Sequence, residues 1–298
     1  MSWRVLYVEE SEHLSLYLDN IKIIKDGEDL LIPISDVHTL ILDNYKINLS
    51  VHLLNALTQG NVNVVLCGVN HLPQSIVFPN SGHHLSTIML KKQLAWSDQE
   101  KQFIQKHIVT NKIRMQYKLL IHRKVSQQIY EKLIQYSNEV TPGDSTNREG
   151  LASKMYFRAL FGESFKRFDD DVLNAGLNYG YSILRSQISK VIVSKGLNTS
   201  LGFFHKGPAN DFNLSDDIIE PFRPIIDHWV ASNLLDEKIF LREHRIGLIK
   251  ATTNNIIFQK QSQSIFNTMN LFVESILSFI ETGDQGIMDQ VDINFYEL

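Results

Sequence analysis

The spacing of apolar residues changes once along this chain, near residue 88, and this change limits the folds open to it. Before it, short runs of Val, Ile, Leu and Tyr such as "WRVLYVEE" and "VNVVLCG" alternate with Asp, Asn and Gly, a pattern typical of strands joined by hairpins. After it, apolar residues recur every three to four positions, as in amphipathic helices. The sequence therefore predicts an α+β protein whose strands precede its helices.

Local signals refine this division. In the first part, "LSVHLLNALTQG" predicts one helix, with Ser50 as its N-cap and Gly60 just after its end. In the second part, "LKKQLAWSDQEKQFIQKHIVTNKIRMQYKLLIHRK" predicts one or two long helices, and helical patterns continue to about residue 285. We expect a small β-domain at residues 1–80, a linker at 81–87 and a larger α-helical domain at 88–298.

Composition places the chain among globular proteins. Its 298 residues are 43% hydrophobic and 21% charged, enough to bury a core. The single cysteine, Cys67, excludes an internal disulfide and a cysteine-based zinc site. The N-terminal "MSWRVLYVEE" lacks the apolar core of a signal peptide, and no stretch approaches the ~20 apolar residues of a membrane span. The sequence predicts a cytoplasmic protein with no membrane association.

The formal net charge of −4 argues mildly against a dedicated DNA-binding domain, which is usually basic. Metal-dependent nucleases, however, carry acidic ligands, and a local basic stripe can guide a phosphate backbone even when the total charge is negative. Composition therefore leaves nucleic-acid binding open.

Glu149 lies in "TNREGLASKMYFRALFG", three residues after Thr146. This spacing is that of a capping box, in which Thr146 bonds the third helical N–H and Glu149 bonds back to the Thr146 N–H. The local sequence favours this structural role and leaves a ligand role for Glu149 open.

His205 lies in "LGFFHKGPAND", two residues before a Gly-Pro turn. A single histidine is usually a surface or core residue. Here the glycine-flanked loop exposes the imidazole and places the positive charge of Lys206 beside it. This setting suits a phosphate or metal site better than a core.

Three acids, Asp216, Asp217 and Glu220, crowd into "SDDIIEPF". If Ser215 caps a helix, Asp216 and Asp217 occupy its first turn, where they favour the helix dipole. Glu220 lies beyond that turn, on the same face as Asp217. Pro221 predicts a bend that can turn Glu220 inward. Capping thus explains two of the acids and leaves Glu220 without a structural role.

Glu149, His205 and Glu220 together form a mixed oxygen and nitrogen ligand set. Carboxylates suit Mg²⁺ or Mn²⁺, and one imidazole is compatible with Mn²⁺, whereas structural zinc is disfavoured. Such an ion polarises a phosphoryl oxygen and orients a hydroxyl or water for in-line attack. Because the ligands would repel one another without metal, we expect Glu220→Ala to leave the melting temperature equal or higher.

The "NREG" glutamate, the "GFFHKG" histidine and "SDDIIEPFRPIID", joined by "NAGLNYGYSIL", closely resemble the CRISPR-associated integrase of spacer acquisition, the universal adaptation endonuclease, in its short type II form. The likeness covers the whole chain, and the order and spacing of these segments make it specific. It implies a β-sandwich-like N-terminal domain that mediates dimerisation, followed by an all-α, metal-dependent catalytic domain.

The resemblance also implies roles for particular residues. Glu149, His205 and Glu220 would be the catalytic ligands of Mg²⁺ or Mn²⁺, with Asp217 as an additional acid beside them. Asn174 and Tyr179, in "NAGLNYGY", would line the same pocket, although packing and helix-end capping explain them equally well.

The implied reaction is a transesterification that joins the 3′-hydroxyl ends of short foreign DNA duplexes into the repeat array, with cleavage of branched DNA as its counterpart. The implied assembly is a homodimer that combines, four copies to two, with a small ferredoxin-like second adaptation protein and binds double-stranded DNA. The type II effector nuclease and an accessory DNA-end-binding protein are further candidate partners.

Basic residues along "KIRMQYKLLIHRK" and in the later helices supply candidate DNA contacts. These candidates are Lys118, Arg123, Lys206, Arg223, Arg242 and Arg245. For any one of them a solvated helix face is the plainer explanation. Two other functions stay open: a metal-dependent phosphodiesterase that acts on branched DNA or RNA without integration, and a catalytically inactive DNA-binding scaffold.

Overall fold

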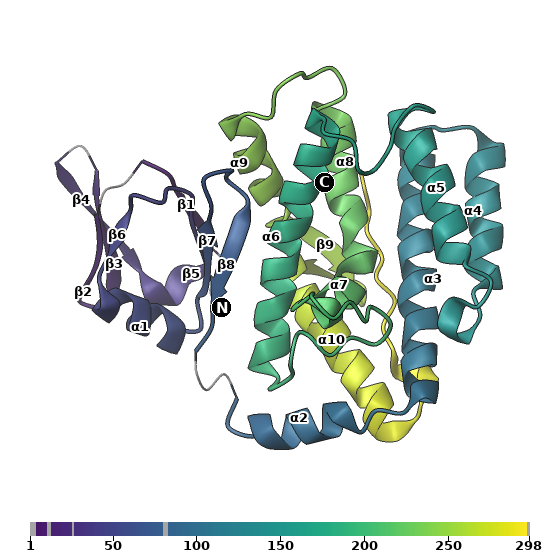
Figure 1. The fold of residues 1–298 in the computed structure, drawn as a ribbon, viewed down its shortest axis with the longest axis horizontal. Coiled ribbons are helices and arrows are strands. Elements are labelled where there is room, and N and C mark those ends of the chain that lie inside the picture. Colours follow the sequence, from purple (N-terminus) through teal and green to yellow (C-terminus); the bar gives the residue numbers. More distant parts are fainter. Residues whose placement is uncertain (1–3, 11–12, 26, 80–82, 297–298) are drawn as a thin grey trace. The chain divides into compact units, whose positions relative to one another are not determined.

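The computed structural model describes residues 4–10, 13–25, 27–79 and 83–296, and it divides into two compact units, Met1–His84 and Leu85–Leu298 (Figure 1). Trp3 of "WRVLYV" and positions 81 and 82 of the expected linker lie outside the described residues. Strands fill the first unit and helices dominate the second, so the predicted fold class is confirmed.

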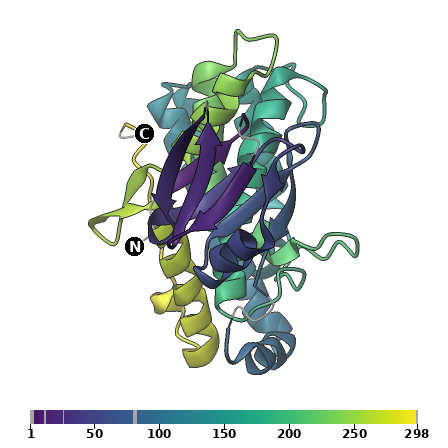
Figure 2. The same ribbon diagram turned by 90° about the vertical axis from the view of Figure 1, so that its left-hand side faces the viewer.

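Two four-stranded sheets form the N-terminal unit, whose strands are purple to blue in Figure 2. In the first sheet, of order β1-β5-β7-β8, the first three strands are parallel and the last is antiparallel. The second sheet has the order β4-β3-β2-β6. The strands are β1 (Arg4–Val8), β2 (His13–Tyr17), β3 (Asn20–Lys25), β4 (Glu28–Pro33), β5 (Val37–Leu42), β6 (Asn48–Leu49), β7 (Asn63–Cys67) and β8 (Pro73–Val77). Hairpins join β2 to β3 and β3 to β4 as expected, but β1 pairs in parallel with β5.

The helix predicted in this unit is present as α1 (Val51–Gln59). Ser50 caps it, because its hydroxyl accepts a hydrogen bond from the Leu53 N–H at 3.2 Å. Leu53 belongs to a cluster of apolar side chains that also includes the fully buried Leu14, Ile21 and Leu40 from both sheets. The alternation of apolar residues along the strands therefore builds one core between the sheets and the helix.

The helical unit begins with α2 (Ser86–Leu94) and α3 (Asp98–His122), and Ser97 and Glu100 form a capping box at the start of α3. The other helices are α4 (Gln127–Glu139), α5 (Arg148–Phe161), α6 (Val172–Ser194), α7 (Asn213–Ile219), α8 (Arg223–Asn233), α9 (Arg242–Ala251) and α10 (Ile265–Thr282). Single 3₁₀ turns are η1 (Ile34–Asp36), η2 (Pro142–Asp144), η3 (Glu220–Phe222) and η4 (Gln285–Ile287). Among the helices of the described residues, none combines the length and apolar character that a bilayer crossing requires.

One hairpin interrupts the helices, so the expectation of helical structure through to residue 285 is wrong at this place. Strands β9 (Asn255–Phe258) and β10 (Gln261–Ser264) pair antiparallel. The two residues between them, Gln259 and Lys260, have φ angles of 50° and 63°. Left-handed conformations at both central positions make the tight turn that matches the twist of paired strands.

The segment α7–η3–α8 contacts α3 as well as α6, and in Figure 1 it lies between them. Pro221 lies in η3, where the α-helical pattern gives way to a 3₁₀ turn as the sequence predicts. On the α6 side the backbones approach closely: a Cβ added to Gly180 would lie 2.4 Å from Ile226 Cγ2. The bent segment is therefore held tightly on the helix that bears Gly180.

Gly180→Ala should destabilise the protein, because overpacking costs about 1–3 kcal/mol and the better helix propensity of alanine returns only ~1 kcal/mol. Urea unfolding followed by circular dichroism measures the change. Gly207→Ala is the matched control, since its added Cβ would lie 3.5 Å from the nearest atom. Equal stability of the two variants would show that α8 can shift to admit the methyl group.

Candidate active site

The acidic segment begins its helix earlier than the sequence suggests. Helix α7 starts at Asn213, and the residue at the N-cap position is Phe212. Ser215 is fully buried inside the helix, where its hydroxyl shares a hydrogen bond with Ser189 Oγ at 2.8 Å. The prediction of Ser215 as a cap is therefore wrong, because the hydroxyl is used for packing against α6.

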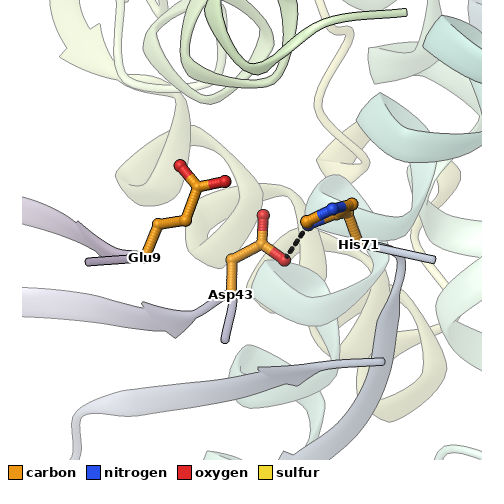
Figure 3. Close-up of side chains that lie close together, drawn as sticks. All are labelled: Glu9, Asp43 and His71. Atoms are coloured by element: carbon orange, nitrogen blue, oxygen red, sulfur yellow. Dashed lines mark hydrogen bonds and ion pairs between the residues drawn. The ribbon is translucent and has the colours of Figure 1, made fainter. Parts of the chain in front are cut away.

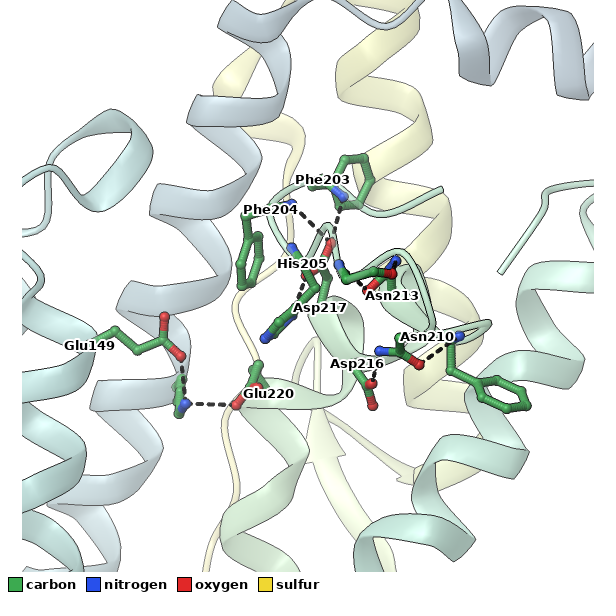
Figure 4. A network of polar contacts seen from close by, with 12 residues as sticks. Glu149, Phe203, Phe204, His205, Asn210, Asn213, Asp216, Asp217 and Glu220 are labelled. Carbon is green, nitrogen blue, oxygen red and sulfur yellow. Dashed lines mark hydrogen bonds and ion pairs between the residues drawn. The ribbon is translucent and has the colours of Figure 1, made fainter. Parts of the chain in front are cut away.

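Asp217 organises the loop that carries the candidate histidine (Figure 4). Its Oδ2 accepts the N–H groups of Phe203 and Phe204 at 2.5 and 3.1 Å. Its Oδ1 accepts the His205 N–H at 3.0 Å and lies 2.6 Å from His205 Nδ1. Asp217 therefore fixes both the backbone and the ring of His205, and it contacts the ring at Nδ1.

The two partners of this pair have shifted pKa values. The hydrogen bond with Asp217 raises the pKa of His205 above its ordinary value. Burial raises the pKa of Asp217, although its bonds to His205 oppose that shift. The pair thus holds a proton between its two groups more firmly than either group would in water.

Glu149 lies in the first turn of α5, but it does not form the predicted capping box. The N-cap is Asn147, whose side chain accepts the Gly150 N–H at 3.2 Å, and Asp144 accepts the Glu149 N–H at 3.0 Å. Thr146 is therefore not the cap, because residues on either side of it already take the free N–H groups. The carboxylate of Glu149 extends instead to Lys112, at 2.7 Å.

Lys112, on α3, joins Glu149 to Glu220. Its Nζ lies 2.7 Å from Glu149 Oε1 and 2.8 Å from Glu220 Oε2 (Figure 4). Burial opposes the charge of Lys112, but attraction to Glu220 and Glu149 outweighs burial and raises the pKa of Lys112. Burial likewise opposes the charge of Glu220, but Arg223 and Lys112 outweigh it and lower the pKa of Glu220. Both carboxylates therefore converge on one cation, whose side chain is only 11% exposed.

This arrangement fits a divalent ion. Two carboxylates from separate helices already share a cation, and Glu220 Oε2 receives no hydrogen bond of good geometry despite its ion pair. Figure 4 shows the His205 ring pointing toward Glu220. Within the described residues, however, the group of His and acid side chains whose ligand atoms all lie within 4.8 Å of one another is Glu9, Asp43 and His71. The ligand atoms of Glu149, His205 and Glu220 are thus not gathered to that distance in this structure.

Arg223 connects Glu220 to a buried carboxylate that sequence reasoning missed. Its Nη2 lies 3.2 Å from Glu220 Oε1, and its guanidinium lies 4.8 Å from the centre of the Tyr181 ring. The Tyr181 hydroxyl donates to Asp227, which also accepts the Tyr156 hydroxyl at 2.7 Å. Burial raises the pKa of Asp227 to about 6, although both tyrosines oppose the shift. An acid inside the apolar run "PIIDHWV" was the available signal.

The two residues predicted to line the pocket, Asn174 and Tyr179, are both buried on α6. Asn174 is buried near the start of α6, where its amide donates to the Lys166 carbonyl at 2.8 Å and accepts from Arg167 at 3.1 Å. The fully buried Tyr179 lies with its ring centre 5.8 Å from that of Phe240. The side chain of Asn174 therefore secures the loop before α6, whereas the cap of that helix is Asp171, which accepts the Asn174 N–H at 2.7 Å.

The candidate DNA-binding residues divide by environment. Lys118 pairs with Asp292, and Arg123 donates to the Ala231 carbonyl at 3.0 Å. Arg245 is buried, whereas Lys206 and Arg242 are exposed. Lys206 and His205 line a surface cavity of about 390 Å³ together with Lys101 and Asn213.

Comparisons with known proteins agree on one family. The sequence profile described as "CRISPR associated protein Cas1" matches residues 6–260. The CRISPR-associated endonuclease Cas1 of Neisseria meningitidis serogroup C (strain 8013) is 32% identical over 281 residues, covering 92% of this chain and 91% of that protein. The one from Korarchaeum cryptofilum (strain OPF8) is 23% identical over 316 residues, covering 91% and 92%.

Solved structures share the fold. A CAS1 protein from Thermotoga maritima has a TM-score of 0.77 at 16% identity, covering 97% of this chain and 100% of that one. A casposase bound to integration product has a TM-score of 0.75 at 18% identity, covering 99% and 93%. A chain of a Cas6-RT-Cas1–Cas2 complex has a TM-score of 0.75 at 16% identity, covering 97% and 36%. At these identities the likeness establishes the fold alone.

Glu220→Ala should destabilise the protein by about 3 kcal/mol, because it removes the buried carboxylate that Lys112 and Arg223 share and leaves Lys112 with Glu149 alone. The structure thus reverses the sequence-based expectation of an equal or higher melting temperature, since the site contains its own counter-charges. Thermal and urea unfolding measure the effect. Glu163→Ala, at an 87% exposed side chain, is the control and should change stability by less than about 0.5 kcal/mol. An unchanged melting temperature in Glu220→Ala would contradict the counter-charge role.

Asp227 should make stability depend on pH. Its pKa is raised from 3.8 to about 6 in the folded protein. The contribution of this carboxyl group to the free energy of unfolding is therefore full at a pH below the pKa of the unfolded chain, and it is lost as the pH rises through the pKa of the folded protein. Relative to Asp227→Asn, the wild type should lose about 3 kcal/mol between about pH 4 and about pH 6.5. Urea unfolding across that range measures the loss. Tyr181→Phe removes a donor to the carboxylate, so it should extend the loss to higher pH. Parallel stability profiles for wild type and Asp227→Asn would exclude the raised pKa.

Proposed function

Because the chain belongs to the Cas1 family of CRISPR-associated proteins, we propose that it is a divalent-metal-dependent DNA integrase and endonuclease of CRISPR adaptation. It joins the 3′-hydroxyl ends of short DNA duplexes into the repeat array by transesterification, and it hydrolyses phosphodiesters in branched DNA. The observation that carries this proposal is the convergence of Glu149 and Glu220, from separate helices, on one cation at 2.7 and 2.8 Å.

In this proposal Glu149, Glu220 and His205 hold Mg²⁺ or Mn²⁺. Such an ion supplies polarisation of the phosphoryl oxygen and alignment of the attacking hydroxyl. Asp217 keeps the His205 ring oriented with Nδ1 hydrogen-bonded and Nε2 available. Arg223 restrains the second oxygen of Glu220. Lys112 balances both carboxylates, and its charge would be available to a substrate phosphate if these carboxylates held an ion.

The proposed partners follow from surface features and from the relatives. Exposed apolar residues on β2 to β4, including Leu30 and Leu31, favour a homodimer formed through the N-terminal unit. Among the structures of like fold, one is a complex that includes Cas2 and another is bound to an integration product, which supports a Cas2 partner and DNA. Lys206 and Arg242 are the better candidates for DNA contact because their side chains are exposed, whereas Lys118, Arg123 and Arg223 are partly buried and Arg245 is buried.

Strand transfer measures the proposal directly. The full chain, the Cas2-type protein of the same locus, a short duplex with 3′-hydroxyl ends and a repeat-containing plasmid are incubated with Mg²⁺ or Mn²⁺. Glu149→Gln and Glu220→Gln should each lose more than about 100-fold of the rate, since they remove a ligand while preserving volume. Asp217→Asn should lose about 10–100-fold, as expected for a residue that positions a ligand.

The control for this assay is Glu163→Gln, a substitution at an exposed carboxylate beyond the other end of α5, which should keep the wild-type rate. Cleavage of branched DNA without integration by the wild type would favour the phosphodiesterase alternative. DNA binding with no metal-dependent product would favour the inactive scaffold. A normal rate in Glu149→Gln and Glu220→Gln would show that the metal site is misassigned.

A further inference from the structure

Three side chains of metal-ligand type meet at one edge of the N-terminal unit (Figure 3). Glu9 follows β1, Asp43 follows β5, and His71 lies in the loop after β7. These three strands are parallel neighbours, in the order β1-β5-β7. Their carboxyl ends therefore lie together, at the kind of edge where open parallel sheets bind ligands.

The three groups are close enough to share an ion. One oxygen of Glu9, one of Asp43 and a ring nitrogen of His71 all lie within 4.8 Å of one another. Asp43 Oδ1 and His71 Nδ1 are 2.9 Å apart. Ligands about 2 Å from a tetrahedral ion lie roughly 3.3 Å apart, so an ion can take the place of the proton between Asp43 and His71 after a small shift. Glu9 would supply the third ligand of such an ion.

The surrounding contacts hold the ligands in position. The Tyr7 hydroxyl donates to Asp43 Oδ2 at 2.5 Å, which leaves Oδ1 directed at His71. The Asn44 amide donates to the Glu9 carbonyl at 2.8 Å and fixes the backbone that carries the carboxylate. Outer contacts of this kind orient metal ligands in proteins.

His71 itself adopts an unusual conformation. Its φ of 63° lies in the left-handed region, and its N–H closes a turn onto the Gly68 carbonyl at 2.9 Å. A residue other than glycine is held there at a cost of about 1–3 kcal/mol. Asp43 is buried, whereas Glu9 and His71 are accessible enough for an ion to enter.

We propose that Glu9, Asp43 and His71 form a Zn²⁺ site that ties together the ends of β1, β5 and β7. Zn²⁺ accepts imidazole nitrogen and carboxylate oxygen and completes its shell with water. Mg²⁺ prefers oxygen ligands in octahedral geometry, and Mn²⁺ binds a mixed nitrogen and oxygen site more weakly than Zn²⁺ does. The site lies within the N-terminal unit and uses none of the residues of the proposed catalytic centre.

Zinc binding to the full chain tests the site. After treatment with chelator, the protein is titrated with ZnCl₂ against a chromophoric competitor, and bound zinc is counted by elemental analysis. The wild type should bind one ion at Glu9, Asp43 and His71, and zinc taken up by the proposed catalytic centre is identified separately with Glu220→Gln. His71→Asn and Glu9→Gln should each weaken the affinity at least about tenfold and reduce the zinc-induced rise in melting temperature accordingly.

Two matched variants separate this site from others. His52→Asn changes an exposed histidine of α1 in the same unit, and Glu220→Gln alters the proposed catalytic centre. His52→Asn should bind zinc as the wild type does, and Glu220→Gln should keep the ion that His71→Asn and Glu9→Gln lose. A melting temperature without metal that is near that of the wild type shows that a variant is folded. If His71→Asn does not fold, Glu9→Gln provides the test. Wild-type affinity in His71→Asn and Glu9→Gln, loss of the ion in Glu220→Gln, or no zinc bound by the wild type would each overturn the proposal.

Discussion

The ammonium of Lys112 is the charge around which the helical unit is arranged. Burial of Glu220 would be prohibitive for an isolated carboxylate, and it is possible because Lys112 and Arg223 lie on either side of it. Glu149 reaches the same ammonium from another helix. Helices α3 and α5 and the turn η3 therefore meet at a charged centre. An apolar core of the same size would not specify the positions of these three elements in this way.

This centre has consequences for any ion that enters it. An incoming divalent cation competes with an internal one, so its apparent affinity is lower than that of the bare ligand set. A phosphate that binds the displaced Lys112 ammonium would offset this loss of metal affinity. Metal and DNA would then strengthen each other's binding by the same factor, because such coupling is reciprocal. A series of contacts leads from Glu220 through Arg223 and Tyr181 to Asp227. The charge at Glu220 is thereby linked to a carboxyl group in the core.

Features with local causes were predictable from the sequence. The change of apolar period gave the order of strands and helices, Ser50 was correctly identified as a cap, and Pro221 marked the break after α7. The other predictions from local sequence failed because residues outside the expected motifs make the contacts. Asp144 and Asn147 replace the expected Thr146 cap, and parallel pairing of strands gathers Glu9, Asp43 and His71 although Asp43 and His71 are 28 positions apart. Lys112 looked like part of a solvated basic stripe because its burial depends on α5 and η3 packing against α3.

The four contacts of Asp217 with residues 203–205 give this loop a distinctive kind of stability. Three backbone N–H groups and one ring nitrogen depend on a single carboxylate, so they open together or not at all. The loop is thus a small cooperative unit, whose amide protons would exchange with solvent at a common rate set by one local opening event. Each such opening also releases the His205 ring, so the lifetime of the ordered loop limits how long the imidazole keeps its orientation.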